Sequence, residues 1–343
     1  MCGRSKRPDH LFYGIPRVQS LWNTAVDNEW QHIKAGCSES RPKMKWQGRR
    51  KSSNVNDQRG RSFGSGGRIA LGGGGLGIVG IVVYLLVSVL GGGGDLGDIL
   101  GSVLAPGTTQ TSTQQQGTYT ESAQEKELMG FLSVALADIE DTWSKVLPAS
   151  EYRTQYQVPE MTIYTGQINT ACGAADSGVG PFYCPGDQTI YLDLSFYNTL
   201  TQKYGATEGD YAMVYVIAHE AGHHVQTLLG VTQQLNTLRQ QVANGTMSQT
   251  EFNRYSVAFE LQADYLAGVV AHFMQERGYL ERGDLSEAMS AAAVVGDDVI
   301  QKRSQGYVDP DTFNHGSSAQ RQDWFRRGYE AGDLSGWDTF AGL

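Results

Sequence analysis

A five-residue stretch, residues 219–223 with the sequence HEAGH, is the feature that most restricts how this chain folds. Residues four apart lie on one face of an α-helix, so His219 and His223 can share a metal ion if the stretch is helical. The run before it, residues 211–218, is apolar and has no Pro or Gly, which is typical of a buried helix. The pattern therefore predicts a zinc site on a buried helix; the alternative is a coincidental pair of core histidines.

Glu220 lies between the two histidines, about 100° around the helix from His219. This position brings its carboxylate beside the open coordination site of a metal held by the imidazoles. A carboxylate there can take a proton from a bound water molecule. We therefore predict His219 and His223 as zinc ligands and Glu220 as a general base.

Charge divides the chain into two unlike parts. Residues 1–68 hold 14 Lys and Arg against 5 Asp and Glu, a net charge of +9, whereas residues 69–343 hold 13 against 31, a net charge of -18. The overall charge of -9 describes neither part. Because nucleic acids are polyanions, an acidic folded region predicts no nucleic-acid partner.

Residues 69–90 form an uncharged stretch of 22 residues, a length that suits one transmembrane helix. A buried helix of a soluble domain is the alternative. The basic residues that precede the stretch are Arg49, Arg50, Lys51, Arg59, Arg61 and Arg68. No Lys or Arg follows until Lys126, so the positive-inside rule predicts a single-pass membrane protein with its N-terminus in the cytoplasm and the acidic part outside.

Composition predicts five regions along the chain. Residues 1–43 show no sustained periodicity. Either the start of the chain is placed too far upstream, or these residues form a small cytoplasmic segment. The regions are this doubtful extension (1–43), a basic cytoplasmic segment (44–68), the transmembrane helix (69–90), a flexible linker rich in Gly, Thr and Gln (91–120) and a folded domain (121–343). The folded domain is long enough to bury one sizeable core.

Periodicity predicts that the folded domain is of the α+β class, mostly helical with a small sheet. Helices are expected over residues 125–147, 209–229, 232–243, 249–277, 284–303 and 317–331, and strands over residues 158–164 and 189–194. Cys172 and Cys184 lie between the two strands, on the side predicted to be exported, where a disulfide is expected. Zinc ligation by this pair is the alternative, although its spacing is unusual for zinc.

A catalytic zinc site needs a third protein ligand. Glu260 and Asp264 are four residues apart in the helix predicted over residues 249–277, so both carboxylates lie on one face among apolar residues. Buried paired acids are costly unless a cation satisfies them, and zinc with its histidines would do so. The alternative is an exposed acidic edge of an amphipathic helix.

At this point the chain resembles the bacterial neutral zinc metallopeptidases. The resemblance covers residues 44 to about 340 and rests on the motifs HEAGH (219–223), ELQAD (260–264), GPFYCP (180–185), YLDLSF (191–196), FNHGS (313–317) and KWQGRR (45–50). It implies a zincin-like domain that is anchored to the bacterial cell membrane. By similarity to gluzincins, Glu260 would complete the metal site and Asp264 would orient a ligating histidine.

The expected function is hydrolysis of peptide bonds in a peptide or protein substrate by a Zn²⁺-activated water, with Glu220 moving the protons. One alternative is a catalytically degenerate zincin that binds cell-envelope proteins. An intact Glu220 speaks against it, because a zinc-binding scaffold has no use for the base. A zinc amidase acting on cell-wall peptides is a further alternative, and it differs only in the shape of its pocket.

His315 lies in a Gly- and Ser-rich loop before a predicted helix and is predicted to be catalytic, stabilising an oxyanion or binding substrate. A structural hydrogen bond at the start of that helix is the alternative. His224 and His272 are expected to be structural. The last helix carries Arg321, Arg326 and Arg327, which are expected on its solvated face. Binding of a substrate carboxylate by these arginines is the alternative.

Overall fold

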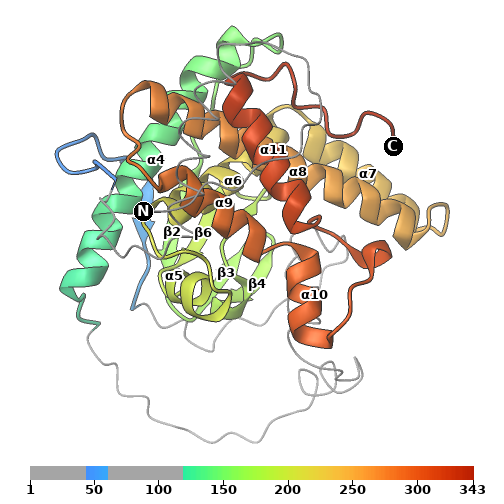
Figure 1. Ribbon diagram of the computed structural model, residues 1–343, viewed down its shortest axis with the longest axis horizontal. Helices are drawn as coiled ribbons and strands as arrows, with labels where there is room; N and C mark the ends of the chain where they lie inside the picture. The colour runs from blue at the N-terminus through green and yellow to red at the C-terminus, as the bar shows by residue number, and fades with distance from the viewer. Residues whose placement is uncertain (1–43, 61–118) are drawn as a thin grey trace, which may run out of the picture. The chain divides into compact units, whose positions relative to one another are not determined.

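The computed structural model describes residues 44–60 and 119–343 (Figure 1). The doubtful extension, the transmembrane helix and nearly all of the linker predicted above lie outside these residues. Within the described ranges, no helix combines the length and the apolar character needed to cross a membrane. The mostly helical α+β class predicted for the domain is confirmed.

The bounds of the regular elements are as follows. The helices are α4 (Ala123–Ala149), α5 (Phe196–Asn198), α6 (Tyr211–Leu228), α7 (Val231–Ala243), α8 (Gln249–Glu276), α9 (Asp284–Val294), α10 (Asp297–Gln305) and α11 (Ser318–Ala331), with a π-helical turn (Thr199–Lys203) and 3-10 turns (Ser177–Val179, Pro310–Thr312). The strands are β1 (Val55–Asp57), β2 (Glu160–Tyr164), β3 (Gln167–Thr170), β4 (Gly173–Asp176), β5 (Phe182–Cys184) and β6 (Thr189–Asp193).

The main sheet has four strands in the order β1-β2-β6-β5. Strand β2 pairs in parallel with both β1 and β6, whereas β5 runs antiparallel to β6. Strands β3 and β4 form a separate antiparallel hairpin. The predicted disulfide between Cys172 and Cys184 is present, and it joins the turn of this hairpin to the end of β5.

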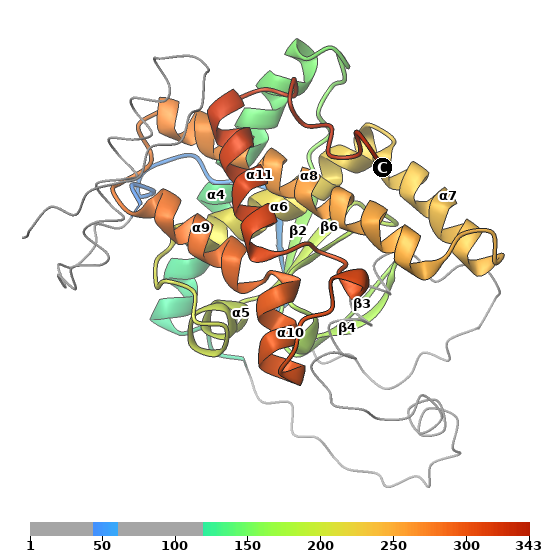
Figure 2. The same ribbon diagram turned by 45° about the vertical axis from the view of Figure 1, so that its right-hand side comes forward.

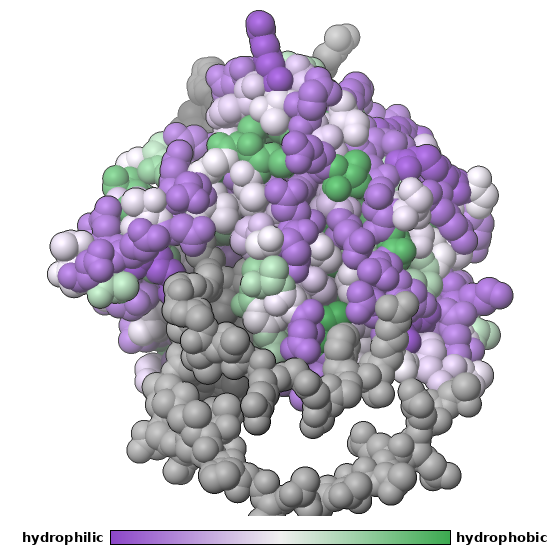
Figure 3. Space-filling model, turned by 180° about the vertical axis from the view of Figure 1, so that it is seen from behind, coloured by the Kyte–Doolittle hydropathy of each residue, from purple (hydrophilic) through white to green (hydrophobic). Residues whose placement is uncertain are grey.

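Helix α6 lies at the centre of the domain and contacts α4, α8, α9, β5 and β6. Its apolar residues are buried on nearly every side, because helices and sheet both cover it (Figures 1 and 2). Helix α11 crosses α8 in both views. Seen from behind, the described surface is largely hydrophilic with a few small hydrophobic patches (Figure 3), so the apolar side chains are mostly inside.

The crossing of α8 and α11 depends on two glycines. A Cβ atom added at Gly268 would lie 2.0 Å from the carbonyl oxygen of Phe325, and one at Gly328 would lie 1.9 Å from that of Tyr265. Real Cβ atoms do not approach an oxygen so closely. The absence of a side chain at both positions therefore lets the two backbones touch.

Residues 44–60 pack against the domain, although their basic composition predicts a separate cytoplasmic segment. Strand β1 adds to the sheet edge at β2. The side chain of Met44 is 2% exposed and belongs to the main hydrophobic core. The structure therefore differs from the predicted domain division: the folded unit includes residues on both sides of the uncharged stretch.

The single helix predicted over residues 284–303 is two helices, α9 and α10, that meet at Gly296. Gly296 has an extended backbone, with φ -69° and ψ 142°. A Cβ atom there would lie 2.4 Å from the backbone nitrogen of Ser318, so the N-terminus of α11 occupies the space that a longer side chain needs. The break turns Asp297 towards the loop that precedes α11.

Candidate metal and catalytic site

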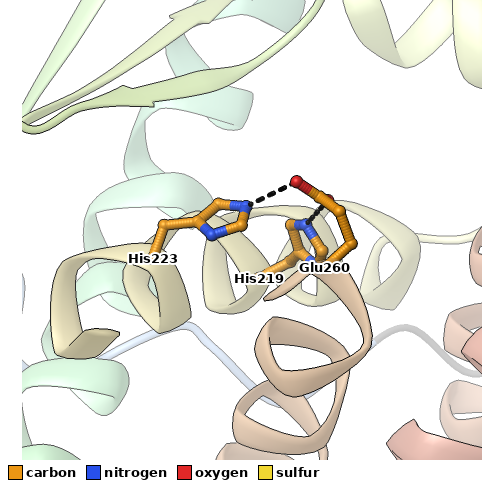
Figure 4. Close-up of side chains that lie close together, drawn as sticks. All are labelled: His219, His223 and Glu260. Atoms are coloured by element: carbon orange, nitrogen blue, oxygen red, sulfur yellow. Dashed lines mark hydrogen bonds and ion pairs between the residues drawn. The ribbon is translucent and has the colours of Figure 1, made fainter. Parts of the chain in front are cut away.

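Three side chains from two helices meet beside the cavity described below. His219 and His223 project from α6, and Glu260 projects from α8 towards them (Figure 4). One oxygen of Glu260 lies 3.2 Å from Nε2 of His219, and the other lies 3.6 Å from Nε2 of His223. The predicted helical spacing of the histidines is therefore what brings both rings to one carboxylate.

The distances between these donor atoms fit a zinc ion. Zinc bonds of about 2.0 to 2.1 Å in a tetrahedron place neighbouring donors about 3.3 Å apart, and one donor atom from each of these three side chains lies within 4.8 Å of the other two. Two imidazoles and one carboxylate also form a donor set found in catalytic zinc sites, where the fourth position stays open. His219, His223 and Glu260 are thus suited to hold Zn²⁺.

Each ligating ring is oriented by a hydrogen bond from its other nitrogen. Nδ1 of His219 lies 2.9 Å from the carboxylate of Asp264, and Nδ1 of His223 lies 2.7 Å from Oε1 of Gln226. Both contacts require a hydrogen on Nδ1, which leaves Nε2 available as the ligand atom. Asp264 therefore holds a ligand in place without touching the metal position.

Asp264 is itself held by two further groups. Arg321 donates to it from Nε at 2.8 Å, and the hydroxyl of Tyr215 donates at 2.6 Å. Arg321 is only 4% exposed, so its predicted place on a solvated helix face is wrong. Arg326 and Arg327 do pair with Asp and Glu residues of their own helix. A fully buried carboxylate needs a cation, and Arg321 supplies it.

The metal-free rings differ in charge. Burial lowers the pKa of His223 to about 4, so this imidazole is neutral at pH 7, which is the ligating form. Burial also opposes the charged form of His219, but the Asp264 carboxylate beside Nδ1 outweighs it and raises the pKa of His219 to about 9. A metal ion must therefore displace a proton from His219 when it binds.

Glu220 is buried at the same cavity. Desolvation raises the pKa of its carboxyl group to about 7, against the opposing effect of the nearby His219. The backbone amide of Tyr183, in β5, also acts to lower this pKa. A carboxyl group with a pKa near neutrality can both accept and release a proton, as a general base requires.

His315 also reaches this cavity. Its Nδ1 donates to one oxygen of Asp297 at 3.0 Å, and the other oxygen accepts the backbone N–H groups of Asn314, His315 and Gly316 at 2.7 to 3.0 Å. Burial alone would lower the pKa of His315, but the Asp297 carboxylate raises it above its ordinary value. The loop is thus fixed, and its imidazole holds a proton more tightly than a free imidazole does.

The two remaining histidines of the described residues, His224 and His272, have structural contacts. His224 lies 2.8 Å from the hydroxyl of Tyr183 through Nδ1 and donates from Nε2 to the carbonyl of Gln157. His272 donates to the carbonyl of Tyr329. These contacts match the structural roles expected for both histidines.

A cavity of about 240 Å³ adjoins the metal position. Glu220, His315 and Arg321 all line it, as does the free edge of the sheet at β5. Much of its wall is apolar, including Phe196, Val216 and Ile300. The cavity can therefore hold an apolar group beside the metal position.

Besides Gln226, which orients His223, three residues of the site were not identified from the sequence. Tyr215 and Arg321 hold Asp264, and Asp297 holds the His315 loop. Tyr215 had one signal, because it precedes His219 by one helical turn and so shares its face. Asp297 and Arg321 had none, because their partners are distant in the sequence.

Two histidines one turn apart on a buried helix, together with a carboxylate from a second helix, form a donor set that is typical of catalytic zinc sites. The family model described as "Putative neutral zinc metallopeptidase" matches residues 44–340. The chain therefore belongs to this family, as the resemblance predicted, and Zn²⁺ is the metal that the family implies.

Two relatives are similar to this chain over more than half of its length. The uncharacterized protein YpfJ of Escherichia coli strain K12 is 47% identical over 302 residues, which cover 87% of this chain and 99% of the relative. An uncharacterized protein of Mycobacterium tuberculosis strain H37Rv is 43% identical over 213 residues, 59% of this chain and 67% of the relative. No solved structure matches the chain.

Proposed function

We propose that this protein is a zinc metallopeptidase that hydrolyses peptide bonds. The observation that carries the proposal is the convergence of a complete zinc donor set, His219, His223 and Glu260, with the buried Glu220 at one cavity. A scaffold that only bound zinc would need the donors but would have no use for a proton acceptor beside them.

The residues divide the reaction between them. When bound, Zn²⁺ supplies a Lewis acid that polarises the scissile carbonyl and acidifies water. Glu220 takes the proton from the attacking water as the new C–O bond forms, and then delivers it to the amine as the C–N bond breaks. His315, held by Asp297, donates from Nε2 to the carbonyl oxygen as negative charge develops there.

The cavity wall suggests which peptides fit. Phe196, Val216 and Ile300 present apolar surface beside the metal position, and burial of an apolar side chain there contributes about 25 cal/mol per Å². We propose that the substrate places a large apolar side chain next to the scissile bond. An extended substrate can also pair with the free edge of β5.

We further propose that the domain works outside the cytoplasm and is attached to the membrane through residues 69–90. The disulfide between Cys172 and Cys184 supports the first point, because disulfides persist in oxidising compartments. The absence of charged residues from the stretch supports the second.

Glu220→Gln tests the activity. The amide keeps the shape of the side chain but cannot accept a proton, so the variant should bind zinc normally and cut a peptide library about 100-fold or more slowly than the parent. Zinc content and peptide cleavage are measured on the full chain. The exposed Glu208→Gln is the matched control and should cut at the parent rate.

Two results would contradict this assignment. Equal cleavage by parent and Glu220→Gln would mean that another group is the base. A zinc-loaded parent that cuts no peptide, yet retains cell-envelope proteins, would instead support the non-catalytic alternative.

A further inference from the structure

The chain leaves and re-enters the described domain at one place. Gly60 is the last described residue before residues 61–118, and Tyr119 is the first after them. A Cβ atom added at Gly60 would lie 2.2 Å from Cβ of Tyr119. Arg59 also pairs with Glu121 at 2.7 Å. Both ends of the intervening stretch therefore belong to one surface.

Residues 44–60 provide partners for two buried carboxylates of α4. Asp138 and Glu140 are each 5% exposed. Arg49 pairs with Asp138, and Glu140 accepts hydrogen bonds from the hydroxyl of Ser52 at 2.5 Å and from the amide of Asn54 at 3.0 Å. Buried carboxylates are unfavourable without such partners, so α4 is built to receive this segment.

Backbone and apolar contacts hold the same segment. Strand β1 pairs with β2 in parallel, with Val55 opposite Met161. Trp46 packs edge-on against Phe131 of α4, with ring centroids 6.1 Å apart. Hydrogen bonds, ion pairs and core contacts thus agree on one docked position for residues 44–60.

The docked position conflicts with a single membrane crossing between residues 60 and 119. One crossing would put residues 44–60 and residues 119–343 on opposite sides, where none of these contacts can form. Three of the basic residues that precede the uncharged stretch, Arg49, Arg50 and Arg59, form ion pairs within the domain. Those charges are matched by carboxylates and do not mark a cytoplasmic flank.

We infer that residues 44–60 lie on the same side of the membrane as residues 119–343, docked on α4 and β2 as part of the folded domain. A chain that leaves the domain at Gly60 and returns at Tyr119 crosses a membrane an even number of times or does not cross it. For an exported domain, residues 44–60 therefore lie outside the cytoplasm with it, and not in the cytoplasm as their composition predicts. It does not depend on the proposed activity.

Cysteine labelling of the full chain tests the inference. Cys2 and Cys37 are replaced by Ser, and a single new cysteine is introduced by Ser53→Cys or by Gln240→Cys, both at exposed positions. Right-side-out and inverted membrane vesicles are treated with a membrane-impermeant maleimide. Labelling after detergent treatment confirms that each thiol can react.

Both cysteines should label in the same vesicle preparation. Labelling of the two positions in opposite preparations would overturn the inference. If both cysteines label only in inverted vesicles, the two segments still lie on the same side of the membrane, but the proposed location outside the cytoplasm is refuted. If the full chain is instead found in the soluble fraction and both cysteines label there, the two segments lie on the same side as inferred. That result would refute the proposed membrane attachment.

Thermal unfolding of the full chain tests the docking directly. Arg49→Ala removes the partner of a buried carboxylate and should lower Tm by about 5 °C or more. Lys51→Ala makes the same charge change at an exposed position of the segment and should shift Tm by no more than about 2 °C. Equal shifts for the two variants would mean that Arg49 is not docked.

Discussion

The hydrogen bond between Asp264 and Nδ1 of His219 determines which ring nitrogen faces the metal position. Nδ1 is used by the carboxylate, so Nε2 remains for the metal, 3.2 Å from Glu260. Glu260 and Asp264 are both buried acids of one helix, yet their tasks differ. Glu260 contributes a donor atom, whereas Asp264 fixes a donor that belongs to another residue.

Substitution should separate these two tasks. Glu260→Ala removes a ligand and should abolish stoichiometric zinc binding. Asp264→Ala should weaken zinc affinity about 10- to 100-fold, with activity partly restored by added zinc, because outer partners only orient the ligand. Competition with a chromophoric chelator measures both affinities. The exposed Glu276→Ala, on the same helix, is the control and should bind zinc like the parent.

The reverse pattern would exchange the two roles. If Asp264→Ala were metal-free while zinc rescued Glu260→Ala, Asp264 would be the ligand. If neither variant lost zinc, the metal would lie elsewhere.

Local spacing was enough to identify the residues that share a helix face. The pairs His219 with His223 and Glu260 with Asp264 both follow from the four-residue period. Arg321 could not be identified in this way, because its partner is 57 residues away in the sequence. An amphipathic pattern shows that a helix has a polar face, but it does not show which arginine of that face meets a buried carboxylate.

At the scale of the elements, the crossing of α8 and α11 is the contact most sensitive to a small change. Gly268→Ala should destabilise the protein by about 2 kcal/mol or more, because the new methyl group meets backbone that cannot rotate away. Alanine favours the helix over glycine by about 1 kcal/mol, so a net loss reports the clash. Urea unfolding measures it.

Gln275→Ala is the control for this substitution. Gln275 is an exposed residue of the same helix, and its change should remain within about 0.5 kcal/mol. A Gly268→Ala variant as stable as this control would show that the helices can separate without cost.

Long periodic elements could be predicted and short ones could not. Helices α6, α7, α8 and α11 begin and end within two residues of their predicted bounds. Strands β1, β3, β4 and β5 were missed, since they have three or four residues and too few positions for alternation to show. The break at Gly296 was missed because its cause, the approach of α11, is tertiary.

At the scale of the whole molecule, the basic and the acidic parts of the chain are joined by ion pairs. The basic N-terminal part supplies Arg49 and Arg50, and the acidic part supplies Asp138 and Glu140. Net charge alone suggested two regions with different surroundings. In the structure, arginines of the basic region neutralise buried carboxylates of the acidic region. Composition cannot reveal this pairing, because it carries no information on contacts.

The completeness of the folded domain can be tested by truncation. A chain of residues 44–343 keeps all described contacts and should unfold like the full chain. A chain of residues 61–343 leaves Asp138 and Glu140 without the partners from the segment, and each broken buried pair costs about 3 to 5 kcal/mol. Its Tm should therefore fall by about 10 °C or more.

Adding the missing segment in trans distinguishes lost docking from general damage. A synthetic peptide of residues 44–60 binds only the folded state of the shorter chain, so its Tm should rise with peptide concentration by mass action. The same peptide with Arg49→Ala should be much weaker, because the Asp138 carboxylate stays unpaired. If the two peptides raised Tm equally, or if the chain of residues 61–343 were as stable as that of residues 44–343, the segment would not be part of the folded domain.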